Sequence, residues 1–252
     1  MVDWDAETYD RVADPQEEWG RGVLARLELE GGETVLDAGC GTGRVTRLLL
    51  ERLPAGRVIG IDASPSMIER ARENLAEFGD RIELEVGDLL ALEPTDPVDA
   101  IFSNATFHWV LDHPTLFGRL HAALRPGGRL EAQCGGEDNV AEWTRAIEAV
   151  EGDERFSPYL RGVLPSYYFA SVGDTRSRLE RTGFDVGDVW LEERVVIPSE
   201  PREYVRSVGS AKLLERLPER LHDEFVDAIL GSMARPLTLH YVRLNISARR
   251  PG

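Results

Sequence analysis

The sequence has a single lysine, Lys212, and little positive charge for its length. Its 252 residues include 45 acidic and 29 basic side chains, which gives a formal net charge of −16. Nucleic-acid-binding proteins usually carry a basic field that displaces counterions from phosphates, and proteins that bind anionic membrane surfaces carry basic clusters. The charge therefore argues against a nucleic-acid substrate and against attachment to a membrane surface.

Long apolar runs and cysteine-rich motifs are also missing. No uninterrupted apolar stretch approaches the ~20 residues that a membrane-spanning helix needs, and the first residues lack the basic-then-apolar pattern of a secretory signal. The two cysteines, Cys40 and Cys134, have no metal-ligand spacing, and no cluster of His, Asp and Glu residues suggests a metal site. We therefore expect a cytoplasmic protein with reduced thiols and no metal.

Strand-like and helix-like segments alternate over the first ~135 residues. Short apolar runs bounded by turn residues predict buried strands, and apolar residues at helical spacing predict the helices between them. Ser64 followed by Pro65, for example, is typical of a helix N-cap and first turn. This alternation favours an α/β fold with parallel strands in one twisted sheet. The predicted strands cover residues 34–37, 57–62, 82–86, 98–102 and 129–134.

The alternation stops after Gly136. Beyond it we expect a helical insertion, a helix followed by a strand, a second helical insertion and a final strand, at residues 137–172, 173–198, 199–235 and 236–252. In the final strand, Tyr241 and Arg243 lie on the polar face because side chains alternate along a strand. The two insertions are predicted to form a small cap over the carboxyl ends of the parallel strands.

A glycine-rich turn joins the first predicted strand to the first predicted helix. It places glycines at alternate positions, Gly39, Gly41 and Gly43, directly after Asp37 and Ala38. Alternate glycines let the backbone turn sharply and approach a ligand closely, at the strand ends where open parallel sheets bind ligands. The spacing differs from the G-x-G-x-x-G of dinucleotide sites, and the preceding Asp37 would repel a pyrophosphate but attract an ammonium group.

Two further acidic residues end the next two predicted strands. Asp62 stands where a carboxylate can accept hydrogen bonds from both hydroxyls of a ribose, and Asp88 stands where an adenine edge would lie. The carboxyl ends of parallel strands share one edge of the sheet, so these two acids and Asp37 are expected to lie close together. The pattern indicates a ligand that carries a ribose and a positive charge.

These residues give the chain a resemblance to a known family. Residues 30–135 resemble the class I S-adenosylmethionine-dependent methyltransferases, and especially the trans-aconitate methyltransferase group. The resemblance implies a Rossmann-like, doubly wound, mostly parallel sheet of seven strands whose last strand runs antiparallel between the fifth and the sixth. The residues that indicate the group are Asp3, Trp4, Tyr9, Phe102, Ser103, Asn104, Ala105, His108, Trp109, Asp112, His113 and the Leu-Arg-Pro-Gly-Gly segment at 124–128.

The same resemblance implies S-adenosylmethionine as the cofactor. Residues 1–30 would cover it and residues 31–136 would form the core that binds it. The methionine part would lie on the three glycines, the ribose on the second-strand acid and the adenine beside the third-strand acid. The residues expected to bind the cofactor are Asp37, Gly39, Cys40, Gly41, Gly43, Asp62, Ala63, Asp88, Leu89, Asn104, Trp109 and Tyr9.

A sulfonium methyl group is already activated, so such an enzyme mainly aligns a nucleophile and excludes water. His108 is the candidate catalytic base for a nucleophile that arrives protonated, whereas a carboxylate needs no base. Arginines would hold a carboxylate through paired hydrogen bonds, and a tricarboxylate would require several of them gathered in the cap. The candidate acceptor-binding residues are Arg243, Tyr241, Trp143, Tyr168 and Arg161.

Three functions stay open at this level. The first is methyl transfer to a small-molecule acceptor, such as a carboxylate like trans-aconitate. The second is methylation of carbon, nitrogen or oxygen in a natural product or in a carrier-bound acyl group. The third is a non-catalytic protein that binds S-adenosylmethionine as a sensor or partner. We expect a monomer or homodimer with a small-molecule substrate and no nucleic-acid or membrane partner.

Overall fold

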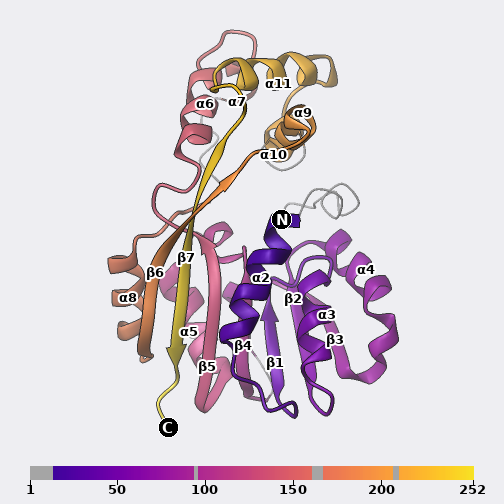
Figure 1. The fold of residues 1–252 in the computed structure, drawn as a ribbon, viewed down its shortest axis with the longest axis vertical. Coiled ribbons are helices and arrows are strands. Elements are labelled where there is room, and N and C mark those ends of the chain that lie inside the picture. The colour runs from indigo at the N-terminus through magenta and orange to yellow at the C-terminus, as the bar shows by residue number, and fades with distance from the viewer. Residues whose placement is uncertain (1–13, 94–95, 161–166, 207–209) are drawn as a thin grey trace.

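The computed structural model describes residues 14–93, 96–160, 167–206 and 210–252. Its central sheet has seven strands in the order β3-β2-β1-β4-β5-β7-β6, with helices on both faces (Figure 1). The strand pairs from β3 to β5 are parallel, and β7 is antiparallel to both β5 and β6. The predicted α/β architecture and the antiparallel last strand are therefore confirmed. The strands are β1 (Thr34–Ala38), β2 (Arg57–Asp62), β3 (Ile82–Val86), β4 (Val98–Asn104), β5 (Leu124–Gly135), β6 (Asp185–Val196) and β7 (Leu239–Arg249).

The helices begin at the capping residues that the sequence indicates. Ser64 accepts a hydrogen bond from the backbone N–H of Met67, and Asp112 accepts one from that of Thr115. Among the described helices, none combines the length and the apolar character needed to cross a bilayer. The helices are α2 (Asp14–Arg26), α3 (Arg44–Glu51), α4 (Pro65–Asn74), α5 (His113–Ala123), α6 (Ala141–Glu151), α7 (Ser157–Leu160), α8 (Val172–Arg181), α9 (Pro201–Tyr204), α10 (Ala211–Leu214) and α11 (His222–Gly231), with 3-10 turns η1 (Ala76–Arg81), η2 (Leu89–Ala91), η3 (Phe107–Trp109) and η5 (Glu219–Leu221).

Several element boundaries differ from the sequence-based prediction, and the two largest differences have a local cause. β5 starts at Leu124 rather than at residue 129, because Leu124 pairs with Val98 before the ladder shifts its register. The helical spacing of Met67, Ala71, Leu75 and Phe78 predicts a helix that continues to Phe78. In the structure α4 ends at Asn74, and the chain continues as a 3-10 turn with Gly79 in the left-handed region (φ 54°). Both differences arise from local irregularities that periodicity does not show.

Each inner strand buries side chains on both faces. Val35 of β1 joins a cluster with residues of α2, α3 and α4, whereas its neighbour Leu36 joins a second cluster with residues of α5 and α8. This two-sided burial explains why the parallel strands are almost continuously apolar. Because β1 is parallel to both β2 and β4, the carboxyl ends of these three strands lie at one edge of the core.

The face of β5 and β7 beneath α2 is polar instead. Gln133 pairs with Asn245 across the two strands, and its Nε2 donates to the Asn245 Oδ1 at 3.2 Å. Arg26 of α2 donates to the same Asn245 oxygen at 3.1 Å and to Glu131 Oε2 at 3.1 Å. We call this set, the half-buried Arg26 with the buried Glu131, Gln133, Arg243 and Asn245, the polar seam. It adds hydrogen bonds to the apolar contacts that Val23, Leu24 and Leu27 of α2 make with the sheet.

The helices α6 and α7, which follow β5, and α9, α10 and α11, which lie between β6 and β7, form a separate group at the top of Figure 1, whereas α8 lies beside the sheet. They share a hydrophobic cluster of their own, which includes Trp143, Phe156 and Phe225. The upper ends of β6 and β7 run into this group, and Trp19 of α2 belongs to the same cluster. The cap is therefore attached to the core by two long strands and by one side chain of α2.

Removal of a central ring should loosen the cap core. Phe156 is fully buried and meets Phe225 edge to face, with ring centres 5.2 Å apart. We expect Phe156→Ala to lower the free energy of unfolding by about 3–5 kcal/mol, because a large buried ring leaves a cavity. Chemical denaturation followed by tryptophan fluorescence measures this. The control is Tyr159→Ala on α7, where 36% of the residue is exposed and the cost should stay below about 0.5 kcal/mol; equal effects of the two variants would contradict the cap core described here.

Candidate active site

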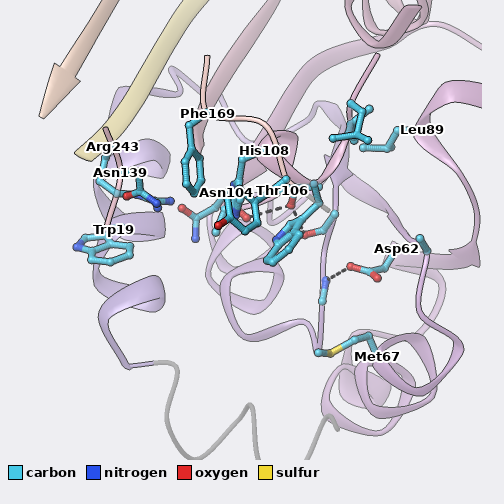
Figure 2. Close-up of a pocket in the computed structure, with 18 of the residues that line it drawn as sticks. Trp19, Asp62, Met67, Leu89, Asn104, Thr106, His108, Asn139, Phe169 and Arg243 are labelled. Atoms are coloured by element: carbon cyan, nitrogen blue, oxygen red, sulfur yellow. Dashed lines mark hydrogen bonds between the residues drawn. The ribbon is translucent and has the colours of Figure 1, made fainter. Parts of the chain in front are cut away.

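A cavity of about 720 Å³ lies between the carboxyl ends of the parallel strands and the cap. Figure 2 shows Asp62, Met67 and Leu89 at one end and Trp19 and Arg243 at the other, with His108 and Asn104 between them. Residues that the sequence predicts to bind the cofactor and residues that it predicts to serve the acceptor line this single space. They are Gly39, Gly41, Asp62, Ala63, Asp88, Leu89, Asn104, His108, Trp109, Trp143, Tyr241 and Arg243.

The glycine-rich turn forms one wall of the cavity. Gly39 has a φ of 89°, and a Cβ there would lie 2.0 Å from the Thr106 Oγ1, so no other residue fits. Gly41 is also left-handed (φ 54°), but a Cβ there would meet no atom within 4 Å. Gly39 is thus needed for contact within the protein, and Gly41 borders open space on the cavity side.

Asp62 connects this turn to the end of β2. Its Oδ2 accepts a hydrogen bond from the backbone N–H of Gly41, and its Oδ1 accepts one from that of Ser64, both at 2.9 Å. Burial raises the pKa of Asp62, and these backbone donors partly oppose that shift. A carboxylate oxygen has two lone pairs, so each can accept a further hydrogen bond from a ligand.

Asp37 lies behind the turn and does not line the cavity. Its Oδ2 accepts a hydrogen bond from the Thr46 Oγ1 at 2.7 Å. Complete burial raises the pKa of Asp37 to about 7, and the nearby Asp62 charge adds to the rise. Cys40 is buried on the same side, and Gly43 is the left-handed N-cap of α3. These three predicted residues support the turn from within the protein.

At the middle of the cavity, His108 has a defined tautomer. The residue is only 8% exposed, and its Nδ1 accepts a hydrogen bond from the backbone N–H of Gly135 at 3.2 Å. A ring nitrogen that accepts carries no hydrogen, so we assign the hydrogen of the neutral ring to Nε2. The rings of Trp109 and Phe169 lie 4.9 and 5.8 Å from the imidazole. His108 is therefore held as a hydrogen-bond donor.

The far end of the cavity contains a buried arginine. Arg243 is 2% exposed, and its Nε donates to the Gln133 Oε1 of the polar seam at 3.2 Å. Its guanidinium lies 4.5 Å from the centre of the Trp19 ring. Beside it, the Tyr241 hydroxyl is hydrogen-bonded to that of Tyr204, and burial raises the pKa of Tyr241. This end thus combines one fixed cation with aromatic rings.

The structure does not bring every predicted residue to the cavity. Tyr168 does not line the cavity: its hydroxyl accepts a hydrogen bond from Arg178 Nη2 at 2.9 Å, and its ring packs against the core beside the buried His113. Tyr9 and Arg161 lie outside the described residues. Lining residues that the sequence analysis did not single out include Trp19, Met67, Thr106, Asn139, Val140, Tyr167, Phe169, Tyr204 and Leu239. Trp19 belongs to an ordinary apolar stripe of α2, and Asn139 and Tyr204 stand in no recognisable motif.

Comparisons with known proteins point to one family of enzymes. Residues 35–128 match the family described as a methyltransferase domain. A trans-aconitate 2-methyltransferase of Methylobacterium nodulans is 33% identical over 99% of both chains, and one of Azoarcus is 44% identical over 53% of this chain and 51% of its own. Among solved structures, a phosphoethanolamine N-methyltransferase of Haemonchus contortus in complex with S-adenosylhomocysteine covers 98% of this chain and 57% of its own, at 20% identity and a TM-score of 0.65.

The residues present suit the cofactor of such enzymes. Gly41 leaves open space where a ligand must approach the backbone, and Asp62 offers acceptor oxygens beside it. Asp88 stands at the next strand end, with Leu89 in the wall beside it. From the fold, the site and the full-length similarity it follows that the chain belongs to the class I S-adenosylmethionine-dependent methyltransferases, in the group of the trans-aconitate 2-methyltransferases, and uses S-adenosylmethionine as its cofactor.

Proposed function

We propose that the enzyme methylates a carboxylate oxygen of a small molecule and so forms a methyl ester. The observation that carries the proposal is Arg243, a guanidinium buried in the wall of the cavity. The names of the relatives from Methylobacterium nodulans and Azoarcus, which specify trans-aconitate, support a carboxylate acceptor. The net charge of −16 argues against a nucleic acid in that role.

Arg243 has the properties of an anion-binding residue. A guanidinium offers five N–H donors in a planar fork that matches a carboxylate, and it stays charged when buried. Gln133 holds its Nε and Trp19 stacks on it, so the orientation of the fork is set before a ligand binds. A charge-assisted pair in this low-dielectric setting is stronger than one on the surface.

We assign the opposite end of the cavity to the cofactor. Asp62 would accept hydrogen bonds from the ribose hydroxyls, Asp88 and Leu89 would contact the adenine, and the glycine-rich turn would border the methionine part. When bound, S-adenosylmethionine supplies an electrophilic methyl group, so that a carboxylate oxygen forms the new O–CH3 bond as the S–CH3 bond breaks and S-adenosylhomocysteine is left. The described residues at the centre of the cavity, Asn104 and His108, come from the end of β4 and from η3.

His108 is better suited to position the acceptor than to deprotonate it. Because Nδ1 accepts the N–H of Gly135, the hydrogen of the neutral ring is on Nε2, which is a donor and not an acceptor. A carboxylate is already a nucleophile near neutral pH and needs no base. We infer that His108 donates a hydrogen bond to the acceptor carboxylate, in place of the base role that its position in the sequence indicates.

The first test removes the proposed anchor. We expect Arg243→Met to lower kcat/KM for a carboxylate acceptor by about 100-fold, mainly through KM, because a charge-assisted pair is lost. S-adenosylhomocysteine should still bind within about two-fold of wild type. Methyl-ester formation from labelled S-adenosylmethionine and calorimetry measure the two effects.

The matched control for that test is Arg206→Met. Arg206 is paired with Asp223 at the surface of the cap and does not line the cavity. Its replacement should leave kcat/KM for the carboxylate acceptor and the affinity for S-adenosylhomocysteine within about two-fold of wild type. An unchanged acceptor KM in Arg243→Met would show that the acceptor binds elsewhere.

A second test separates a donor from a base at residue 108. His108→Gln keeps an N–H donor but has no titratable group, so kcat should fall by about ten-fold or less and keep the pH profile of the wild type. Loss of a general base would instead lower kcat by about 10²–10⁴-fold and remove the acid limb of the profile. Steady-state rates between pH 6 and 8 distinguish the two, and the second pattern would refute the donor role.

A third test uses the buried carboxyl of Asp37. Its pKa of about 7 in the fold lies above its ordinary 3.8, so the unfolded chain releases a proton that the folded chain keeps. The stability of the free enzyme should therefore fall as the pH rises from about 4 to 7 and stay level above it. We expect Asp37→Asn to melt at a higher temperature than wild type at pH 8 and at a similar temperature at pH 4.

The same variant should bind S-adenosylmethionine about ten-fold more weakly at pH 8, since a negative charge near a cationic ligand is lost. Thermal denaturation and calorimetry measure the two effects. A melting-temperature difference that does not change with pH would mean that Asp37 is already ionised in the free enzyme.

A further inference from the structure

Aromatic and aliphatic side chains dominate the acceptor end of the cavity. Beyond His108 the wall is formed by rings and alkyl groups from α2, from the two cap insertions and from β7. The lining residues on which this argument depends are Trp19, Val140, Trp143, Phe169, Leu239 and Tyr241. Trp19, Trp143, Leu239 and Tyr241 belong to the hydrophobic cluster of the cap. A ligand that fills this end therefore exchanges water for apolar contacts.

The charges along the wall suit at most one negative group on the acceptor. Within the described part of the chain, Arg243 is the one lysine or arginine that lines the cavity, and Asp62, Asp88 and Asp112 are the carboxylates that line it. A tricarboxylate trianion would bring three negative groups to an acceptor end whose described wall offers one guanidinium. Burying an unmatched charge is costly, so the site disfavours compact polycarboxylates.

Arg243 and His108 are placed to share one carboxylate. Gly135 pairs with Arg243 across β5 and β7, and the N–H of the same Gly135 donates to His108. The arginine and the histidine thus flank one residue that has no side chain. A Cβ at Gly135 would lie 2.6 Å from the Phe169 ring, so this residue also gives the ring its place in the wall. The carboxylate held here would have the apolar cap, and no second cation of the described residues, beyond it.

We propose that the acceptor is a monocarboxylate with an extended apolar body, such as a medium-chain fatty acid or an arylalkanoic acid. This inference rests on the proposed function, because it assumes that Arg243 binds the carboxylate that is methylated. The body lies against Trp143, Leu239 and Phe169, and the carboxylate lies between Arg243 and His108. The acceptor class therefore differs from the compact tricarboxylate that the relatives' names specify.

A chain-length series tests the proposal. Butyrate, hexanoate, octanoate and decanoate differ only in apolar length, and trans-aconitate is the polycarboxylate comparison. Each buried CH2 should raise kcat/KM by about two- to four-fold until the cavity is filled. Octanoate should therefore exceed butyrate by about 100-fold and should also exceed trans-aconitate. Calorimetry of the same acids on protein saturated with S-adenosylhomocysteine provides a binding readout that is independent of turnover.

The outcomes separate the two proposals. Preference for trans-aconitate with no rise along the fatty-acid series would overturn this inference and leave the proposed function intact. If no carboxylate is methylated or bound while S-adenosylhomocysteine binds normally, the proposed function fails and this inference fails with it.

A variant of the wall gives an independent check. Phe169 is half-buried and stacks on Tyr167 with ring centres 4.6 Å apart. Phe169→Ala should lower the ratio of kcat/KM for octanoate to that for butyrate by about ten-fold, since the longer acid loses more apolar contact. Phe169→Leu keeps most of the apolar volume and should change the ratio by less than about three-fold. An unchanged ratio in the alanine variant, with a melting temperature like that of wild type, would count against an apolar body at this wall.

Discussion

The pairing of β7 between β5 and β6 is the constraint on which the acceptor end of the site depends. One strand carries Leu239 into the cap, Tyr241 and Arg243 to the cavity and Asn245 into the polar seam. A slip of one residue would turn each of these side chains to the opposite face of the sheet. Gln133 and Arg26 donate hydrogen bonds to Asn245, and a slip would break these bonds and leave buried polar groups without partners. The bonds therefore oppose a change of register.

The cofactor end depends on backbone conformation and on buried charge instead of on strand register. Here the turn holds glycines in left-handed conformations, and two carboxyl groups are buried within reach of each other. Neither feature favours the fold by itself, since buried like charges raise the free energy of the folded state. The cofactor carries the positive charge that this arrangement lacks. The part of the molecule that opposes folding is thus the part that we assign to S-adenosylmethionine.

The residues of the cofactor end can be predicted from the sequence more completely than those of the acceptor end. The glycines, Asp62 and Asp88 could be predicted because each follows a strand, and parallel strands bring their ends together. Trp19, Asn139 and Tyr204 reach the same cavity from α2, from the segment after β5 and from the second cap insertion. Only the packing of the cap on the core brings these three together, and no local pattern shows it. Tyr168 and Phe169 are a second example. Neighbouring extended residues point to opposite sides of the chain, and the sequence does not show which of the two lines the cavity.

The polar seam affects the entropy cost of binding a ligand to Arg243. A long arginine side chain that is free in solution loses roughly 2 kcal/mol of rotational freedom when a ligand fixes it. In this protein the restriction occurs during folding, because Gln133 and Trp19 already hold Arg243 in place. An acceptor held by Arg243, as we propose, would meet a guanidinium whose orientation is already fixed. Acceptors whose carboxylate matches that orientation would be favoured over those that require the arginine to move.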